Sequence, residues 1–190
     1  DLAAAERLYR GAVEDFGRFN TTLKPTKETL NNMGIAFAKL GVYRMADKES
    51  PLYTYNTHFS VERDLAVKFM SVRRESQRVA KTRGAGGSKP IPREIEQAIK
   101  HFKKALALDS SYHKARVNLA LVYLAKRQYA EATKTIEKAD ELAGADVGRI
   151  RNLRGVIHAA AGRPAEAVSS FEAASQDEDA RAAATFNLGL

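Results

Sequence analysis

One spacing recurs four times along this chain: an alanine is followed, twenty residues later, by an asparagine. Phenylalanine or isoleucine stands four residues after each alanine, and methionine or leucine follows each asparagine. The four pairs are Ala12 and Asn32, Ala98 and Asn118, Ala132 and Asn152, and Ala167 and Asn187. A fixed register between one helix and the next is typical of stacked helical repeats, which are usually binding surfaces rather than catalysts.

The composition favours an all-helical fold. Alanine, leucine, lysine, arginine and glutamate are frequent, and only 5 of the 190 residues are proline. The chain has no cysteine, which excludes disulfides and thiolate metal sites. No apolar run reaches the roughly 20 residues that a membrane-spanning helix needs. The chain begins at Asp1 without an initiator methionine, so we expect it to be a piece of a longer protein, and its compartment stays open.

Helical periodicity is clear in the second half of the chain. Apolar residues at steps of three and four predict two antiparallel helices at about 115–126 and 129–142. The next pair of helices is separated by a turn in which Gly162 suits a helix C-terminus and Pro164 suits the first turn of the following helix.

Two stretches carry a more specific pattern. In residues 30–37 and 116–123 a small residue, Gly34 or Ala120, follows methionine or leucine, and an aromatic residue, Phe37 or Tyr123, stands three positions later. The chain therefore resembles the tetratricopeptide repeat family. The third copy departs from the pattern, because Arg154 takes the place of the small residue and the turn holds one extra residue. The resemblance covers about three quarters of the chain and implies a right-handed superhelical solenoid of antiparallel helix pairs with one concave side.

The interval from Asn32 to Asn118 is 86 residues, where one repeat of this family takes about 34. We interpret it as one repeat with a long insertion between its two helices, at about 48–92; the alternative is an additional degenerate helical pair. The expected units are the second helix of a preceding repeat at 1–20, a repeat with the insertion at 28–108, repeats at 113–142 and 147–176, and the start of a further repeat at 180–190.

The insertion holds most of the positive charge. Between Leu65 and Arg93 there are eight lysines and arginines but one acid, Glu75, against a net charge of +8 for the whole chain. One interpretation is a surface that binds a polyanion or a membrane. We favour the other, in which a helix packs on the solenoid and its charges are merely solvated. Few aromatic residues interrupt the basic run, so nucleic acid is not the expected partner. The polyanion-binding candidates are Arg73, Arg74, Arg78, Lys81 and Arg83.

In the family that this chain resembles, the first helix of each pair lines the concave groove. The register predicts a ladder of Asn32, Asn118, Asn152 and Asn187 along that groove, similar to the ladder in the tetratricopeptide region of O-linked N-acetylglucosamine transferases. An asparagine amide offers a donor and an acceptor, which suits the backbone of an extended peptide. The alternative is that these asparagines order the neighbouring helix. The expected flanking residues, which suggest peptides with acidic and hydrophobic positions, are Lys27, Asn31, Ile35, Lys39, Lys114, Val117, Leu121, Arg151, His158 and Phe186.

No catalytic or cofactor motif is recognisable. The four histidines lack metal-ligand spacing, and the glycine-rich stretch at 84–88 lacks the Gly-Lys-Ser/Thr ending of a phosphate-binding loop. No catalytic arrangement of a nucleophile and a base can be argued from the sequence. We therefore predict a protein–protein interaction scaffold and neither an enzyme nor a cofactor. An alternative is the substrate-recruiting region of a larger enzyme. Open terminal repeats also suggest end-to-end self-association.

Overall fold

The computed structural model describes residues 2–45, 91–142 and 144–189. Over these ranges the chain forms eight α-helices and one 3-10 turn, with no strand, as the predicted all-α fold requires. The elements are α1 (Leu2–Thr22), α2 (Lys27–Met45), α4 (Arg93–Leu108), α5 (His113–Ala125), α6 (Tyr129–Asp140), η2 (Gly144–Asp146), α7 (Val147–Ala160), α8 (Pro164–Ser175) and α9 (Glu178–Leu188). Nearly all of the predicted insertion, with its alternative helical pair and its five polyanion-binding candidates, lies outside the described residues.

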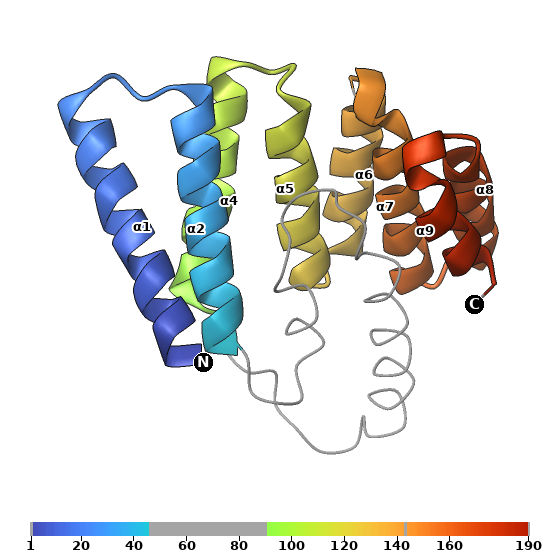
Figure 1. Cartoon of the computed structure of the whole chain (residues 1–190), viewed down its shortest axis with the longest axis horizontal. Helices are drawn as coiled ribbons and strands as arrows, with labels where there is room; N and C mark the ends of the chain where they lie inside the picture. The colour runs from blue at the N-terminus through green and yellow to red at the C-terminus, as the bar shows by residue number, and fades with distance from the viewer. Residues whose placement is uncertain (1, 46–90, 143, 190) are drawn as a thin grey trace.

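The helices stand side by side in a row that runs from α1 at one end to α8 and α9 at the other (Figure 1). Three helix pairs lie within this row, namely α2 with α4, α5 with α6, and α7 with α8. Each pair then packs on the next through α4 with α5 and α6 with α7. α1 packs against α2, and α9 packs against α8 and α7. This stacking of helix pairs is the predicted solenoid architecture.

Close approach of two helices within a pair explains two of the glycines. A Cβ atom added to Gly34 would lie 2.5 Å from Cε1 of Phe102, and one added to Gly155 would lie 2.4 Å from Cε1 of Phe171. Each phenylalanine ring therefore fills the space that a side chain on the first helix would occupy. The position of the small residue thus fixes how each first helix is rotated against its second helix.

The third copy keeps its small residue, which corrects the sequence prediction. Gly155 lies twelve residues before Ala167, just as Ala120 lies twelve residues before Ala132, so Arg154 is the neighbour of the small residue rather than its replacement. The turns between the paired helices also have the same length, 126–128 and 161–163. The apparent extra residue arises because Asn152 stands one position earlier, relative to its turn, than Asn118 does.

Both of these turns end the first helix in the same way. Arg127 and Gly162 have positive φ angles of 59° and 75°. The next residue in each turn donates its backbone N–H back into the helix, from Gln128 to the carbonyl of Tyr123 and from Arg163 to the carbonyl of His158, both at 2.9 Å. This pattern is the Schellman motif, which satisfies helix-end carbonyls and reverses the chain.

A continuous apolar core runs along the stack from α2 to α8. The second helices contribute one stripe each, as in α4, where Phe102 is buried and its neighbours Lys103 and Lys104 are exposed. The central helix α5 is buried almost all round. No pair encloses its own core, so the stacked neighbours supply the burial that stabilises each one. Large, fully buried members of this core are Ile95, Phe102, Val122, Ile136, Ile150, Leu153 and Ile157.

Candidate functional site

Four asparagines join the first helices of neighbouring pairs. Asn118 on α5 donates from Nδ2 to Oδ1 of Asn31 on α2, and Asn187 on α9 donates to Oδ1 of Asn152 on α7, both at 2.9 Å. All four side chains are buried, with exposed fractions of 3–4%. The amides are thus paired with one another in the core, and each bond links helices that are far apart in the sequence.

The asparagine that Asn118 meets is Asn31, one residue before the predicted position Asn32, which is exposed. Asn31 and Asn152 stand three residues before Gly34 and Gly155, whereas Asn118 stands two residues before the small residue of its own helix. One residue corresponds to about 100° around a helix. In the described part of the chain, no hydrogen bond joins Asn118 to Asn152, so the amides form two separate pairs rather than one continuous ladder.

Each pair leaves one buried acceptor unused. The Oδ1 atoms of Asn118 and Asn187 are inaccessible to solvent and have no hydrogen-bond partner. Leaving such an atom unpaired costs about 1–3 kcal/mol.

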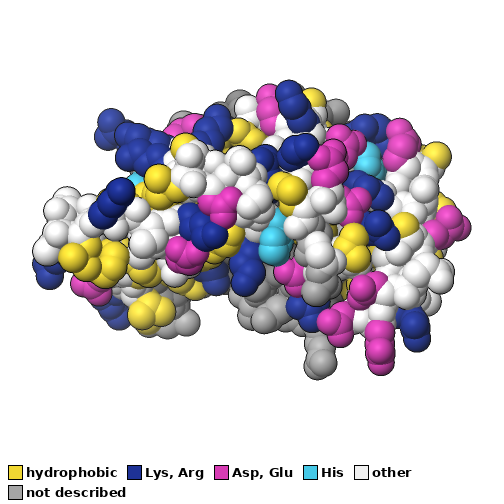
Figure 2. Space-filling view, turned by 90° about the horizontal axis from the view of Figure 1, so that it is seen from above, with side chains coloured by type: hydrophobic (Ala, Val, Ile, Leu, Met, Phe, Trp, Pro, Cys, Tyr) yellow, Lys and Arg dark blue, Asp and Glu magenta, His cyan; other side chains and the backbone are white. Residues whose placement is uncertain are grey.

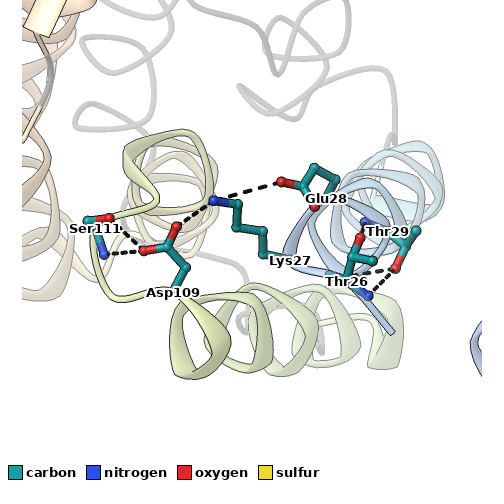
Figure 3. A network of polar contacts seen from close by, with 6 residues as sticks. All are labelled: Thr26, Lys27, Glu28, Thr29, Asp109 and Ser111. Atoms are coloured by element: carbon teal, nitrogen blue, oxygen red, sulfur yellow. Dashed lines mark hydrogen bonds and ion pairs between the residues drawn. The ribbon is translucent and has the colours of Figure 1, made fainter. Parts of the chain in front are cut away.

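Lys27, a predicted flanking residue, is held at the start of α2 by the loop between α4 and α5 (Figure 3). Its Nζ atom lies 2.6 Å from Oδ2 of Asp109 and 5.2 Å from the ring centre of Tyr112. Asp109 also accepts hydrogen bonds from the hydroxyl and backbone N–H of Ser111, at 2.6 Å and 2.8 Å. The hydrogen bonds from Lys27 and Ser111 lower the pKa of Asp109 to about 2, and the same contact with Asp109 raises the pKa of Lys27. This ammonium group links the start of α2 to the loop between α4 and α5.

The close-up also shows how α2 begins (Figure 3). The backbone N–H of Thr29 donates to the hydroxyl of Thr26 at 3.2 Å, and the N–H of Thr26 donates to the hydroxyl of Thr29 at 3.0 Å. This reciprocal capping satisfies N–H groups that the first turn of a helix leaves without partners.

Two arginines on α7 share one carboxylate on α6. Arg151 donates from Nε to Oδ1 of Asp140 at 3.2 Å, and Arg154 donates to Oδ2 of the same residue. Arg154 also donates to the hydroxyl of Ser170 on α8 at 3.2 Å. The predicted flanking residue Arg151 is thus part of a structural cluster between α6, α7 and α8. The spacing of twelve residues from Gly155 to Ala167 is the signal in the sequence that would have placed Arg154 at this junction.

His158 takes the position of an aromatic residue. It follows Gly155 by three residues, as Phe37 follows Gly34 and Tyr123 follows the small residue of α5. Its side chain is buried, and burial, with smaller contributions from nearby arginines, lowers its pKa, which favours the neutral ring. The environment of His158 is therefore that of a packed core residue.

The other predicted flanking residues divide by exposure. Lys114, at the start of α5, and Phe186, beside Asn187 on α9, are exposed. Val117 and Leu121 are buried in the core. The Nζ atom of Lys39 lies 5.5 Å from the ring centre of a tyrosine on α1, and burial lowers its pKa. Of the predicted flanking residues, Lys114 and Phe186 are therefore the ones most open to a ligand.

The described surface has mixed charge. Figure 2 shows acidic and basic side chains interspersed over the face that it views. Among residues 2–45, 91–142 and 144–189, no group of three or more histidine, aspartate or glutamate side chains could hold a metal ion. None of the helices in these ranges is long and apolar enough to span a membrane.

A family model for the tetratricopeptide repeat matches residues 93–157, which extend from the start of α4 into α7. Over these residues the chain carries the tetratricopeptide repeat. Its helix pairs, its small residues facing Phe102 and Phe171 and its Schellman turns agree with that assignment. Proteins of this family are in general protein-interaction scaffolds, and the fold of this chain supports that general role.

Solved structures to which this chain is similar include TTC0263, a tetratricopeptide repeat protein of Thermus thermophilus, at 22% identity and a TM-score of 0.49, with 100% of each chain covered. The crystal structure of MamA is similar at 20% identity and a TM-score of 0.43, covering 92% of this chain and 91% of that one. A further MamA structure is 18% identical, with a TM-score of 0.43 and 95% of each chain covered. No curated protein sequence matches this chain.

Proposed function

We propose that this chain binds an extended segment of a partner protein along the side formed by the first helices α2, α5, α7 and α9. The observation that carries the proposal is that two first-helix residues, Lys114 on α5 and Phe186 on α9, are exposed on the same stack of helix pairs. An extended segment presents side chains at regular intervals, so one segment can contact more than one helix pair.

The strength of such binding depends on several contacts acting together. A single hydrogen bond contributes only about 0.5–1.5 kcal/mol net. The exposed residues nearby suggest the chemistry of the partner. Lys114 lies one helical turn before Asn118, and Phe186 is adjacent to Asn187. We therefore expect peptides that combine acidic and hydrophobic side chains.

The test begins with a displayed library of random peptides, selected on the immobilised chain. The affinity of a selected peptide is then measured by fluorescence anisotropy. Lys114→Glu should weaken binding of an acidic peptide by roughly three- to tenfold, the effect of reversing one exposed charge. Lys134→Glu makes the same change on the exposed side of α6, a second helix, and should leave the affinity unchanged.

Selection of no peptide above background would overturn the proposal. Peptides whose affinity changes equally with Lys114→Glu and with Lys134→Glu would also overturn it, because the change in affinity would then depend on net charge rather than on the position of the lysine. Both residues are exposed, so neither change should shift the thermal unfolding transition by more than a surface substitution does.

A second function rests on charge in the sequence. The basic run between Leu65 and Arg93, which includes Arg73, Arg74 and Arg78, supports binding of a polyanion or an anionic membrane surface. Binding of this kind weakens steeply with salt because counterions are released. Heparin and anionic vesicles, titrated at increasing salt, test it, and no binding at low salt would remove it.

A further inference from the structure

Although the described surface as a whole has mixed charge, the exposed side of α4 is basic. It carries Lys100, Lys103 and Lys104, which we call the α4 lysine cluster. Lys103 and Lys104 follow Lys100 by three and four residues, the spacings at which like charges on a helix repel one another. The last turn of α4, where the helix dipole stabilises positive charge, holds no basic residue. Neither the dipole nor the mutual interaction of the lysines therefore accounts for the cluster.

Matching positions on the other second helices are not basic in this way. Counted from Ala98 and Ala132, five matching positions are exposed on both α4 and α6. On α6 they hold two lysines and three glutamates, and Lys138 is bonded to Glu141, whereas on α4 they hold three lysines and no acid. The matching residues of α8 include two glutamates and no base. Uncompensated positive charge is thus a property of α4 and not of the repeat. The five positions are Gln97, Lys100, Lys103, Lys104 and Ala107 on α4, and Glu131, Lys134, Glu137, Lys138 and Glu141 on α6.

Two acids flank the α4 lysine cluster, and both are engaged elsewhere. Glu96, in the first turn of α4, accepts a hydrogen bond from Lys126 at 2.7 Å. Asp109, just after the last turn, accepts one from Lys27 at 2.6 Å. Within residues 2–45, 91–142 and 144–189, no lysine of the cluster forms an ion pair. Its positive charge is therefore available to an outside partner.

An exposed leucine continues the line of the cluster. Leu108 follows Lys104 by four residues, just as Lys104 follows Lys100, so the three residues lie along one side of α4 over about 12 Å. Leu108 is 55% exposed. This side of α4 therefore offers positive charge and an apolar contact in a row.

We propose that the α4 lysine cluster and Leu108 bind an acidic segment of a partner protein, with an apolar side chain next to its carboxylates. The surface belongs to a second helix and is separate from the first helices α2, α5, α7 and α9. Opposite charges across an interface steer association and fix its orientation. A short protein segment fits better than a membrane or a nucleic acid, because the cluster is small and the glutamates at matching positions of α6 and α8 would repel a broad anionic surface.

Selection against a competitor isolates peptides that bind this surface. A displayed library of random peptides is selected on the immobilised chain in the presence of excess soluble Lys100→Glu/Lys104→Glu variant. This variant keeps Lys114 and Phe186, so it removes peptides that bind the first helices, and failure of one proposal leaves the other intact. The peptides that remain should be rich in aspartate and glutamate and should contain an apolar residue.

Fluorescence anisotropy then measures the affinity of a remaining peptide for each variant. Lys100→Glu/Lys104→Glu should weaken binding by roughly ten- to a hundredfold, the effect of reversing two exposed charges. Lys134→Glu/Lys138→Glu is the matched control, because it changes the net charge equally at the corresponding positions of α6, and it should leave the affinity unchanged. Equal loss of affinity in the two double variants would overturn the proposal.

A second pair of variants tests the apolar contact. Leu108→Ser should weaken binding by roughly three- to tenfold, whereas Val168→Ser, at an exposed apolar position on α8, should not change it. An unchanged affinity of Leu108→Ser would remove the apolar contact from the site.

Circular dichroism establishes that each variant is folded, and Lys100→Gln/Lys104→Gln replaces the charge-reversed variant if that one unfolds. A selection that leaves no peptide, or leaves peptides without an excess of acids, would overturn the proposal. Binding of heparin or of anionic phospholipid vesicles that is lost in Lys100→Glu/Lys104→Glu, with no peptide selected, would assign the cluster to a polyanion instead.

Discussion

The bond between Asn118 and Asn31 ties together two first helices through residues that lie 87 positions apart in the sequence. Replacing Asn118 by alanine removes the donor and leaves Oδ1 of Asn31 buried without a partner. Replacing Asn31 by alanine leaves the whole amide of Asn118 unpaired, because its oxygen has no partner already. Each single change should therefore lower the free energy of unfolding by about 1–3 kcal/mol.

The double replacement of Asn31 and Asn118 removes both polar groups at once. It should cost less than the sum of the two single changes, with an interaction energy of about 1 kcal/mol, the net worth of a buried hydrogen bond. Asn32→Ala is the matched control. This asparagine is the immediate neighbour of Asn31 but is exposed, so its replacement should change the free energy of unfolding by no more than about 0.5 kcal/mol.

Urea denaturation of the four proteins in the cycle, followed by far-ultraviolet circular dichroism, measures these quantities. Single changes that add within about 0.3–0.5 kcal/mol in the double variant would refute the bond. An effect of Asn32→Ala as large as that of Asn31→Ala would refute the register. Asparagines that served a ligand alone would be replaced at little cost, so the experiment also separates a structural role from a binding role.

Two further predictions concern packing and pH. Gly155→Ala should lower the melting temperature, because overpacking against Phe171 costs about 1–3 kcal/mol while the higher helix propensity of alanine returns up to about 1 kcal/mol. Adding Phe171→Ile copies the combination of Ala120 and Ile136 and should restore part of the lost stability. A double variant no more stable than Gly155→Ala would contradict this account. His101 stacks on Phe37 at 5.4 Å, and burial, with Lys104 and Lys100, lowers its pKa from 6.5 to about 4. The folded state therefore resists protonation, and stability should fall as the pH decreases from about 6.5 to about 4. His101→Phe keeps the stack on Phe37 and should reduce this loss of stability, measured as the difference in urea midpoint between about pH 7 and about pH 5. An unchanged difference would contradict the role of His101.

The helices and turns were accessible from the sequence because their signals are local. The predicted helices at about 115–126 and 129–142 correspond to α5 (His113–Ala125) and α6 (Tyr129–Asp140). Gly162 ends α7 with a positive φ angle, and Pro164 opens α8, as their backbone preferences require. Each of these features depends on a few neighbouring residues, so a linear pattern is sufficient to predict it.

The orientation of each helix was not accessible in the same way. The twenty-residue spacing relates each asparagine to the second helix of the preceding pair. The rotation of a first helix is instead set by where its glycine meets a phenylalanine, as Gly155 meets Phe171. A difference of one residue rotates a side chain by about 100°, enough to exchange Asn31 for Asn32. The sequence by itself determined that the chain forms stacked helix pairs, because periodicity and turn residues act locally. Only tertiary packing decided that its asparagines form two buried pairs, because contacts between distant helices fix which face of each helix turns inward.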